Sequence, residues 1–314
     1  MFNSYYKEMN LKLSLRVLFL VAIAFIASSI TQRTFVADEP LNVYVVNYPL
    51  KYFAERIGAE HVKVTFPAPP DVDPAYWIPD IKTIADYQKA DLIVLNGASY
   101  AKWVEKVSLP RSRFVNTSRQ FRDRYVNTEG SVTHTHGPGD NHSHGEIAFT
   151  TWLDFTLAVQ QAEAIAVALS RKSPQHREVF RENFRSIHRD LMALDSAIRN
   201  IVDRNPDIPL IASHPVYDYL SGAYGMNLKS VHWEPEEFPD DRQWIHFKAI
   251  LKEHPSKWML WEGTPDPAIV SALKSMGLNS VVFDPCGNVP EQGDFITMME
   301  QNIQNLDKVY TSSK

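Results

Sequence analysis

A long amphipathic stretch lies between Pro174 and Pro206. Apolar residues recur in it at alternating steps of four and three positions, with Arg, Glu, Asp and Asn between them. The apolar positions are Phe180, Phe184, Ile187, Leu191, Leu194, Ile198 and Ile201. This spacing predicts one α-helix with a single apolar face. Ser173-Pro174 suits its first turn, and Asn205-Pro206 ends it because proline cannot continue a helix.

Short apolar runs alternate with helical patterns on both sides of this stretch. The predicted strands are 41–46, 62–66, 91–96 and 113–116 before it, and 210–213, 228–231, 258–261 and 280–283 after it. The predicted helices are 49–57, 78–88, 100–107, 216–224, 241–252 and 268–276. Such alternation predicts an α/β fold of two lobes, each with a four-stranded parallel sheet flanked by helices. Ligands then bind where the strands end, in the cleft between the lobes.

The long helix has two interpretations. In one it is a coiled-coil arm through which two chains dimerise. In the other its apolar face packs against both lobes and joins them. Four heptads between two α/β patterns more often form such a linking helix than a dimeric coiled coil. We favour the second. It divides the chain into an N-terminal lobe at 38–173, a linking helix at 174–206 and a C-terminal lobe at 207–314.

The first 37 residues have the pattern of a targeting segment. Lys7, Lys12 and Arg16 precede an apolar run at 17–27, and small polar residues follow it. This pattern is typical of a secretory signal. The run is shorter than the roughly 20 residues that span a bilayer, although an uncleaved N-terminal anchor stays an alternative. Either way we expect the remainder to be exported, to the periplasm or another extracytoplasmic location.

Composition limits the classes of function. A chain of 314 residues that is 44% hydrophobic and 22% charged is long enough for two cores. Its net charge of −5 argues against nucleic acid or an anionic membrane surface as a partner. The single cysteine, Cys286, excludes an intrachain disulfide and leaves no cysteine near the N-terminus for lipid modification.

A histidine-rich segment, SVTHTHGPGDNHSHG at 131–145, interrupts the α/β pattern. His134, His136, His142 and His144 lie among Gly, Pro, Asn and Ser, so the segment cannot bury a core and should be a mobile loop. Imidazole binds zinc, copper and nickel well, and several imidazoles in one loop can converge on one ion. A solvated polar loop or an accidental tag are the alternatives, but the position inside an exported α/β protein favours metal capture.

Four segments together resemble the solute-binding receptors of zinc and manganese ABC importers, the ZnuA/TroA-like type. They are the region 45–107, which begins VVNYPLKYFAERIGAEHVKV, then TTWLD at 150–154, SHPVYDYLSGAYGM at 213–226 and VVFDP at 281–285. The resemblance covers about 41–306. It implies two lobes joined by one long helix, a metal ion between them and a His-rich loop in the zinc importers.

The resemblance carries over two of the four usual metal ligands. The first histidine of the family follows an Asp-Pro pair, where this chain has Ala75, and the second is replaced by Thr150. His214 fills the third position, where manganese-type members tend to carry Glu, and Asp284 fills the fourth. Two ligands hold zinc poorly, because zinc sites normally supply three or four protein donors at about 2.0–2.3 Å.

Three arrangements can account for the two missing metal ligands. Two of the loop histidines can join His214 and Asp284 in a nitrogen-rich tetrahedral site, which we favour. Neighbours can be recruited, such as Glu262 at the end of its own strand or Cys286 just beyond Asp284, although Cys286 suits a small buried residue better. Alternatively, the receptor has no tight metal site.

Another acidic group lies in SVHWEPEEF. A second metal-binding cluster could be formed by His232, Glu234 and Glu236. The polar, proline-containing surroundings of these residues favour a surface loop instead. We therefore predict that this segment is an exposed surface loop.

The sequence thus predicts an exported, monomeric receptor that captures a divalent metal ion and delivers it to the permease of an ABC importer. Zinc is the expected ion, in preference to manganese or another divalent transition metal. The receptor would touch the membrane only through an uncleaved anchor. A periplasmic metal buffer or adaptor that feeds no transporter is the alternative. No catalytic motif is found, and a zinc hydrolase would depend on Glu262 as its base, so we do not expect an enzyme.

Overall fold

The computed structural model describes residues 39–70, 72–128, 133–135, 141–143 and 147–311. Both lobes lie in one compact unit that begins at Pro40. The targeting segment at 1–37 lies outside the described residues. None of the described helices combines the length and the apolar character needed to cross a membrane.

The N-terminal lobe is built on a parallel sheet with the strand order β2-β1-β3-β4. The strands are β1 (Leu41–Val45), β2 (Val62–Thr65), β3 (Leu92–Leu95) and β4 (Phe114–Asn116). Its helices are α2 (Tyr48–Gly58), α3 (Ile81–Tyr87) and α4 (Phe155–Lys172). Val43, Val45 and Ile93 are completely buried, as expected of central strands covered on both faces.

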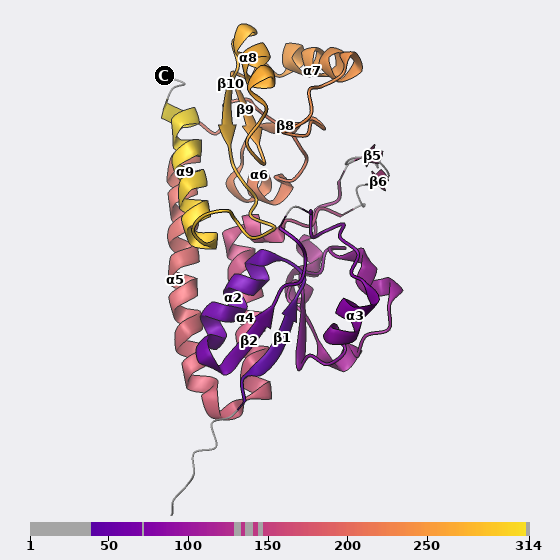
Figure 1. Ribbon diagram of the computed structural model, residues 1–314. Coiled ribbons are helices and arrows are strands. Elements are labelled where there is room, and N and C mark those ends of the chain that lie inside the picture. Colours follow the sequence, from indigo (N-terminus) through magenta and orange to yellow (C-terminus); the bar gives the residue numbers. More distant parts are fainter. Residues whose placement is uncertain (1–38, 71, 129–132, 136–140, 144–146, 312–314) are drawn as a thin grey trace, which may run out of the picture. The chain divides into compact units, whose positions relative to one another are not determined.

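The C-terminal lobe has a second parallel sheet with the order β10-β9-β7-β8. Its strands are β7 (Leu210–Ala212), β8 (Leu228–Ser230), β9 (Trp258–Trp261) and β10 (Asn279–Val282). Its helices are α6 (Asp218–Tyr224), α7 (Asp241–Glu253), α8 (Pro267–Ser275) and α9 (Phe295–Thr311). The two sheets confirm the predicted α/β fold of two lobes (Figure 1).

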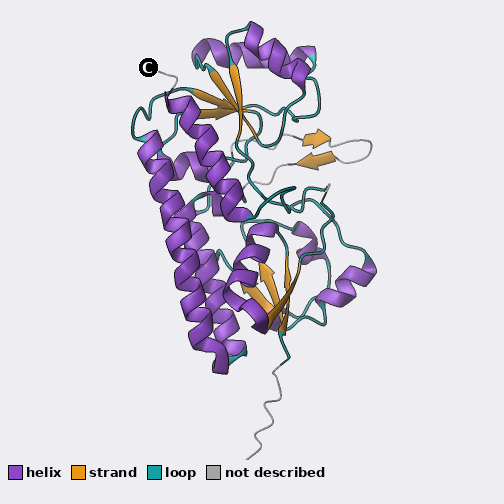
Figure 2. Cartoon of the chain, turned by 60° about the vertical axis from the view of Figure 1, so that its left-hand side comes forward, coloured by secondary structure: helices purple, strands orange, loops and turns teal. Residues whose placement is uncertain are grey.

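Helix α5 (Arg177–Val202) joins the lobes. It packs against α2 and α4 of the N-terminal lobe and against α6 and α9 of the C-terminal lobe, and Figure 2 shows the strands of both lobes on the same side of it. Of the seven predicted apolar positions all but Phe184 are buried, and Phe184 packs partly buried against the core. Because this face is buried within the chain, none of it is left for a coiled coil.

Short 3₁₀ helices complete the fold. They are η1 (Ala59–His61), η2 (Lys102–Lys106), η3 (Arg111–Arg113), η4 (Arg119–Arg124), η5 (Thr151–Leu153) and η6 (Pro174–His176). We predicted an α-helix at 100–107, and this prediction is wrong. Gly97, Ala98, Ser99 and Ala101 all have positive φ angles, so the chain enters a right-handed turn only at Lys102.

Six residues of the His-rich segment pair as a short antiparallel ribbon, β5 (Thr133–Thr135) and β6 (Asn141–Ser143), with His134 opposite His142. We predicted a mobile loop here, and we did not anticipate this pairing. The alternation of Thr, Asn or Ser with His fits the two-residue period of a strand. His136 and His144 lie outside the described residues.

Two helix caps fix the loops at the upper edge of the N-terminal sheet. The Asn47 side chain accepts the N–H of Leu50 at 3.2 Å and begins α2 directly after β1. The Asp154 carboxylate accepts the N–H groups of Thr156 and Leu157 at 2.9 and 3.3 Å and begins α4. The Asp154 cap holds the preceding segment at 149–152, part of which forms one wall of the site described next.

Candidate metal centre

Three ligand-type side chains converge where the C-terminal sheet ends. His214 follows β7, Glu262 directly follows β9, and Glu234 lies in the segment after β8. The Nε2 atom of His214 lies 3.6 Å from Oε1 of Glu234, and its Nδ1 atom lies 3.9 Å from Oε1 of Glu262. One ligand atom from each residue lies within 4.8 Å of the other two. We call these three residues the His-Glu-Glu cluster.

The topology of the sheet explains why they meet. β7 pairs in parallel with both β8 and β9, so all three strands end at the same edge. Beyond β8, Val231 and Trp233 donate backbone hydrogen bonds to Ala212 and Ser213, at 2.9 and 2.7 Å. The chain therefore continues beside β7 as far as Trp233, which places Glu234 next to His214.

This geometry corrects one prediction. We assigned His232, Glu234 and Glu236 to a surface loop, and for Glu234 that is wrong, because its side chain is only 18% exposed. The indole of Trp233 is buried among other aromatic rings, and this pulls the polar segment into the lobe. His232 is partly buried with its ring 5.7 Å from that of His214, whereas Glu236 is exposed.

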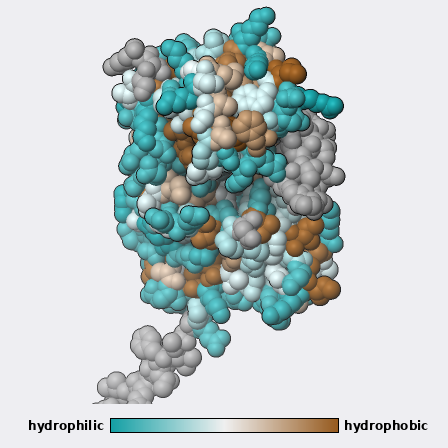
Figure 3. All heavy atoms as spheres, turned by 45° about the horizontal axis from the view of Figure 1, so that its top comes forward, coloured by the Kyte–Doolittle hydropathy of each residue, from teal (hydrophilic) through white to brown (hydrophobic). Residues whose placement is uncertain are grey.

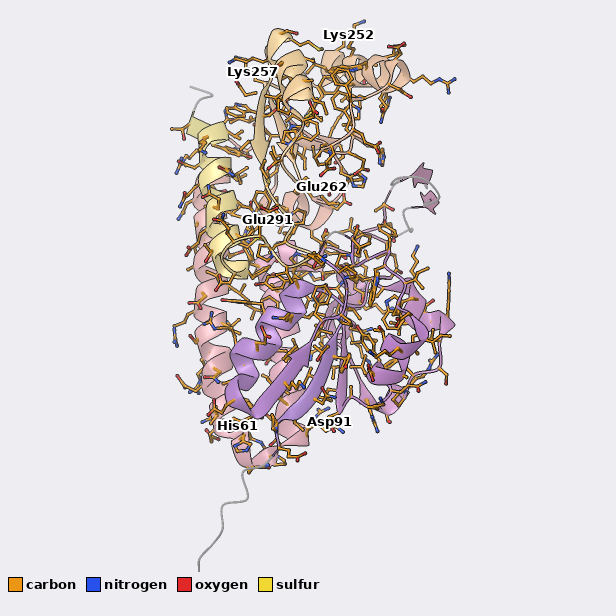
Figure 4. All side chains as sticks on the ribbon, viewed as in Figure 1. His61, Asp91, Lys252, Lys257, Glu262 and Glu291 are labelled. Carbon is orange, nitrogen blue, oxygen red and sulfur yellow. The ribbon has the colours of Figure 1, made fainter. Side chains whose placement is uncertain are left out.

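A cavity of about 420 Å³ lies over the cluster, between the lobes, and we call it the interlobe cavity. Glu234 and Glu262 line it, while His214 lies behind them with 4% of its surface exposed. In Figure 4, Glu262 lies where the C-terminal sheet faces the N-terminal lobe. Figure 3 shows a mainly hydrophilic face with smaller apolar patches.

Negative charge accumulates in the interlobe cavity. Its described lining contains five carboxylates and no Lys, Arg or His; the carboxylates belong to Asp73, Glu234, Glu236, Glu262 and Asp284. Burial, reinforced by neighbouring acidic groups, raises the pKa of Glu234 to about 7 and the pKa of Glu262 well above its ordinary value. A bound cation would stabilise both carboxylates in their charged form.

Asp284 lines the same cavity but lies outside the His-Glu-Glu cluster. Burial raises the pKa of Asp284. The hydrogen bond that its Oδ1 accepts from the N–H of Cys286, at 2.7 Å, offsets part of this rise. The backbone of Asp284 is fixed on both sides by Asn302, through bonds of 2.9 and 2.7 Å. Cys286 is buried, with 2% of its surface exposed.

The N-terminal wall provides no imidazole at the two expected positions. Ala75 is buried, and the Thr150 hydroxyl donates to the carbonyl of Val216 at 2.6 Å. Asp73 lines the cavity instead, while its Oδ1 accepts the N–H of Ala75 at 2.8 Å. Its charge contributes to the raised pKa values of Glu234 and Glu262. We missed Asp73, although the Asp-Pro pair before Ala75 marked this turn.

The structure does not describe where the side chains of the His-rich segment lie relative to the His-Glu-Glu cluster. His136 and His144 lie outside the described residues, and for His134 and His142 only the backbone is described. Their part in a metal site stays a prediction.

Comparison with known proteins identifies relatives over nearly the whole chain. The zinc-binding lipoprotein AdcA of Streptococcus pneumoniae is 24% identical over 305 residues, which cover 94% of this chain and 60% of AdcA. The high-affinity zinc uptake system protein ZnuA of Bacillus subtilis is 26% identical over 279 residues, 85% of this chain and 87% of the relative. The manganese-binding lipoprotein MntA of Bacillus subtilis is 23% identical over 62% of this chain and 61% of its own.

A solved structure shares the fold. The Zn(II)-bound ZnuA-like domain of AdcA from Streptococcus pneumoniae superposes with a TM-score of 0.73 at 19% identity, covering 86% of this chain and 99% of the domain. The family model for the zinc-uptake complex component A, periplasmic (ZnuA), matches residues 43–309. The resemblance seen in the sequence is thereby confirmed, and the chain belongs to the ZnuA family.

Proposed function

We propose that this protein captures a divalent metal ion, zinc in the first place, outside the cytoplasm and delivers it as a monomer to the permease of an ABC importer. Membership of the ZnuA family supports the transport role. The observation that carries the metal site is the His-Glu-Glu cluster, whose ligand atoms lie within 4.8 Å of one another. Such spacing suits three donors that share one ion at about 2.0–2.2 Å each.

The donor set suits more than one metal. One imidazole and two carboxylates can bind zinc, and oxygen-rich sites also suit manganese. We propose zinc because the imidazole of His214 lies at the centre of the cluster, and because AdcA and ZnuA are named for zinc. MntA, named for manganese, makes that ion the alternative cargo.

Calorimetric titration of residues 38–314 tests this proposal. We expect one equivalent of zinc to bind with a Kd below about 1 μM, corresponding to about 8 kcal/mol, and manganese to bind more weakly. No binding of either ion would rule out the receptor function. A permease and an ATPase encoded beside the gene would favour a receptor over a metal buffer or adaptor.

An enzymatic function has less support. The matched family is one of metal uptake. The base that a zinc hydrolase requires was assigned to Glu262, and this carboxylate belongs to the cluster that we propose to hold the ion. A carboxylate bound to the metal is not free to activate water, so we propose transport without catalysis.

Zinc affinity should fall as the pH drops below neutrality. The pKa of Glu234 is about 7 in the metal-free protein, and zinc must displace its proton below that pH. One such proton weakens binding by about 20-fold between pH 7.5 and 5.5, and the raised pKa of Glu262 adds to the effect. Calorimetry in buffers of different ionisation enthalpy measures both the affinity and the protons released. A change below threefold would contradict a role for Glu234, because an ordinary carboxylate stays ionised over this range.

Deleting residues 131–145 tests the contribution of the His-rich segment. In place of the arrangement favoured from the sequence, we propose that the cluster holds the tightly bound ion and that the histidines of the His-rich segment only collect zinc. The deletion should therefore remove weak binding equivalents and leave the tight site within about threefold of its original affinity, a change under 1 kcal/mol. A loss of 100-fold or more would instead make loop imidazoles ligands of the tight site.

A further inference from the structure

The two walls of the interlobe cavity differ in chemistry. All three members of the His-Glu-Glu cluster belong to the C-terminal lobe. On the opposite wall, Ala75 has no donor atom in its side chain, the hydroxyl of Thr150 donates to Val216, and the Asp73 carboxylate lines the cavity outside the cluster. Zinc usually binds at least four donors, so a three-residue cluster leaves one or more coordination positions open.

The interlobe cavity is large for a bare ion. Its volume is about 420 Å³, whereas one water occupies about 30 Å³ in the liquid. Pockets of about 300–1,000 Å³ are typical of small organic ligands. The space over the cluster can therefore accommodate a metal together with a molecule of amino-acid size.

The N-terminal wall is aromatic. Tyr100, Phe149 and Trp152 line it, with ring centroids of Tyr100 lying 5.3 Å from Phe149 and 5.9 Å from Trp152. The Phe149 backbone is fixed by the side-chain amide of Asn96, which donates to its carbonyl at 2.9 Å. An ordered aromatic surface packs well against a carbon skeleton or a second ring, and poorly against water.

The charge of the lining restricts which molecule could accompany the metal. Five carboxylates face the cavity, and no basic side chain occurs among its described lining residues. A carboxylate-rich chelator would add negative charge and be repelled. A ligand that binds metal through an amine or imidazole nitrogen leaves the complex positively charged, which matches the cavity.

We infer that the interlobe cavity takes the metal as a cationic complex with one small nitrogen-donor ligand of amino-acid size. The His-Glu-Glu cluster binds the metal, and the accompanying ligand fills the remaining coordination positions and packs against Phe149 and its aromatic neighbours. This inference rests on the proposed function, because it requires that the cluster bind a divalent ion.

Equilibrium dialysis of the metal-free protein against radiolabelled L-histidine, with and without equimolar zinc, tests the inference. We expect about one equivalent of label to be retained with zinc and none without it. Zinc binding with no retained label would overturn the inference and leave the proposed function intact. Retention of label without zinc would overturn it in favour of an amino-acid site, and binding of neither would overturn the proposed function as well.

A variant of the aromatic wall sharpens the test. Phe149→Ala should lower retention of the label at least 10-fold in the presence of zinc, while the affinity for zinc alone stays within threefold. The backbone carbonyl held by Asn96 is unaffected by this change. Phe238→Ala is the matched control, because Phe238 is 57% exposed and does not line the cavity. Equal losses of label in both variants would contradict the assigned role of the wall; if Phe149→Ala does not fold, the dialysis of the unaltered protein decides alone.

Discussion

Replacing His214 with alanine is expected to weaken zinc binding about 100-fold. Zinc sites with four protein ligands bind with about 10–16 kcal/mol, so one lost ligand removes about 3 kcal/mol. Glu234 and Glu262 stay in place but lose the nitrogen donor between them. Competition with a chromogenic zinc chelator measures the change without depending on the heat of protonation.

Two further measurements separate a ligand from a structural histidine. His246→Ala is the matched control, since His246 is exposed on α7, and zinc affinity should not change. If His214 served only to compensate the charge of two buried glutamates, His214→Ala would destabilise the metal-free protein and leave zinc binding unchanged. That pattern would contradict the site proposed here.

Truncating Phe180 to alanine is expected to lower the free energy of unfolding by about 3–5 kcal/mol. Phe180 is completely buried on α5, where its ring contacts the rings of His61 and His176 at 5.9 and 6.2 Å. The lost ring leaves a cavity that neighbouring helices cannot fill without moving. Denaturant titration of the metal-free protein measures the effect.

The preceding residue of the helix supplies the comparison. Val179 is 39% exposed, so Val179→Ala should change the free energy of unfolding by no more than about 0.5 kcal/mol. Similar losses in the two variants would mean that the apolar face of α5 does not stabilise the protein through burial.

Regular patterns made most of the fold predictable. The sheets and α5 follow from the strand and helix periods of the apolar residues, because most of those residues lie on buried strands or on the buried face of α5. Helices α4 and α9 were missed. α4 contains five alanines, of which Ala158, Ala162 and Ala166 are buried, and alanine contributes little contrast to the apolar pattern. The 3₁₀ helix η2 was mistaken for an α-helix, since nothing in its periodicity reveals the positive φ angles that precede it.

The site was predictable only where it follows the sheet. His214 was named from the family resemblance and Glu262 as its neighbour, and each follows a strand of the C-terminal sheet. Glu234 was considered but assigned to a surface loop, because its position depends on Trp233 being buried and on two backbone hydrogen bonds beyond the end of β8. Asp73 belongs to the opposite lobe, and only the tertiary structure brings it to the same cavity.

The last helix of the chain completes the core of the first lobe. Phe295 on α9 contacts the rings of Tyr52 and Phe53 on α2 at 5.8 and 5.4 Å, and a single hydrophobic cluster runs through both lobes. The rings of Tyr52 and Phe53 on α2 are therefore not fully packed until α9 has been synthesised. Folding should depend on contacts distant in sequence and proceed slowly. We expect a single cooperative melting transition, in contrast to proteins whose domains unfold one at a time.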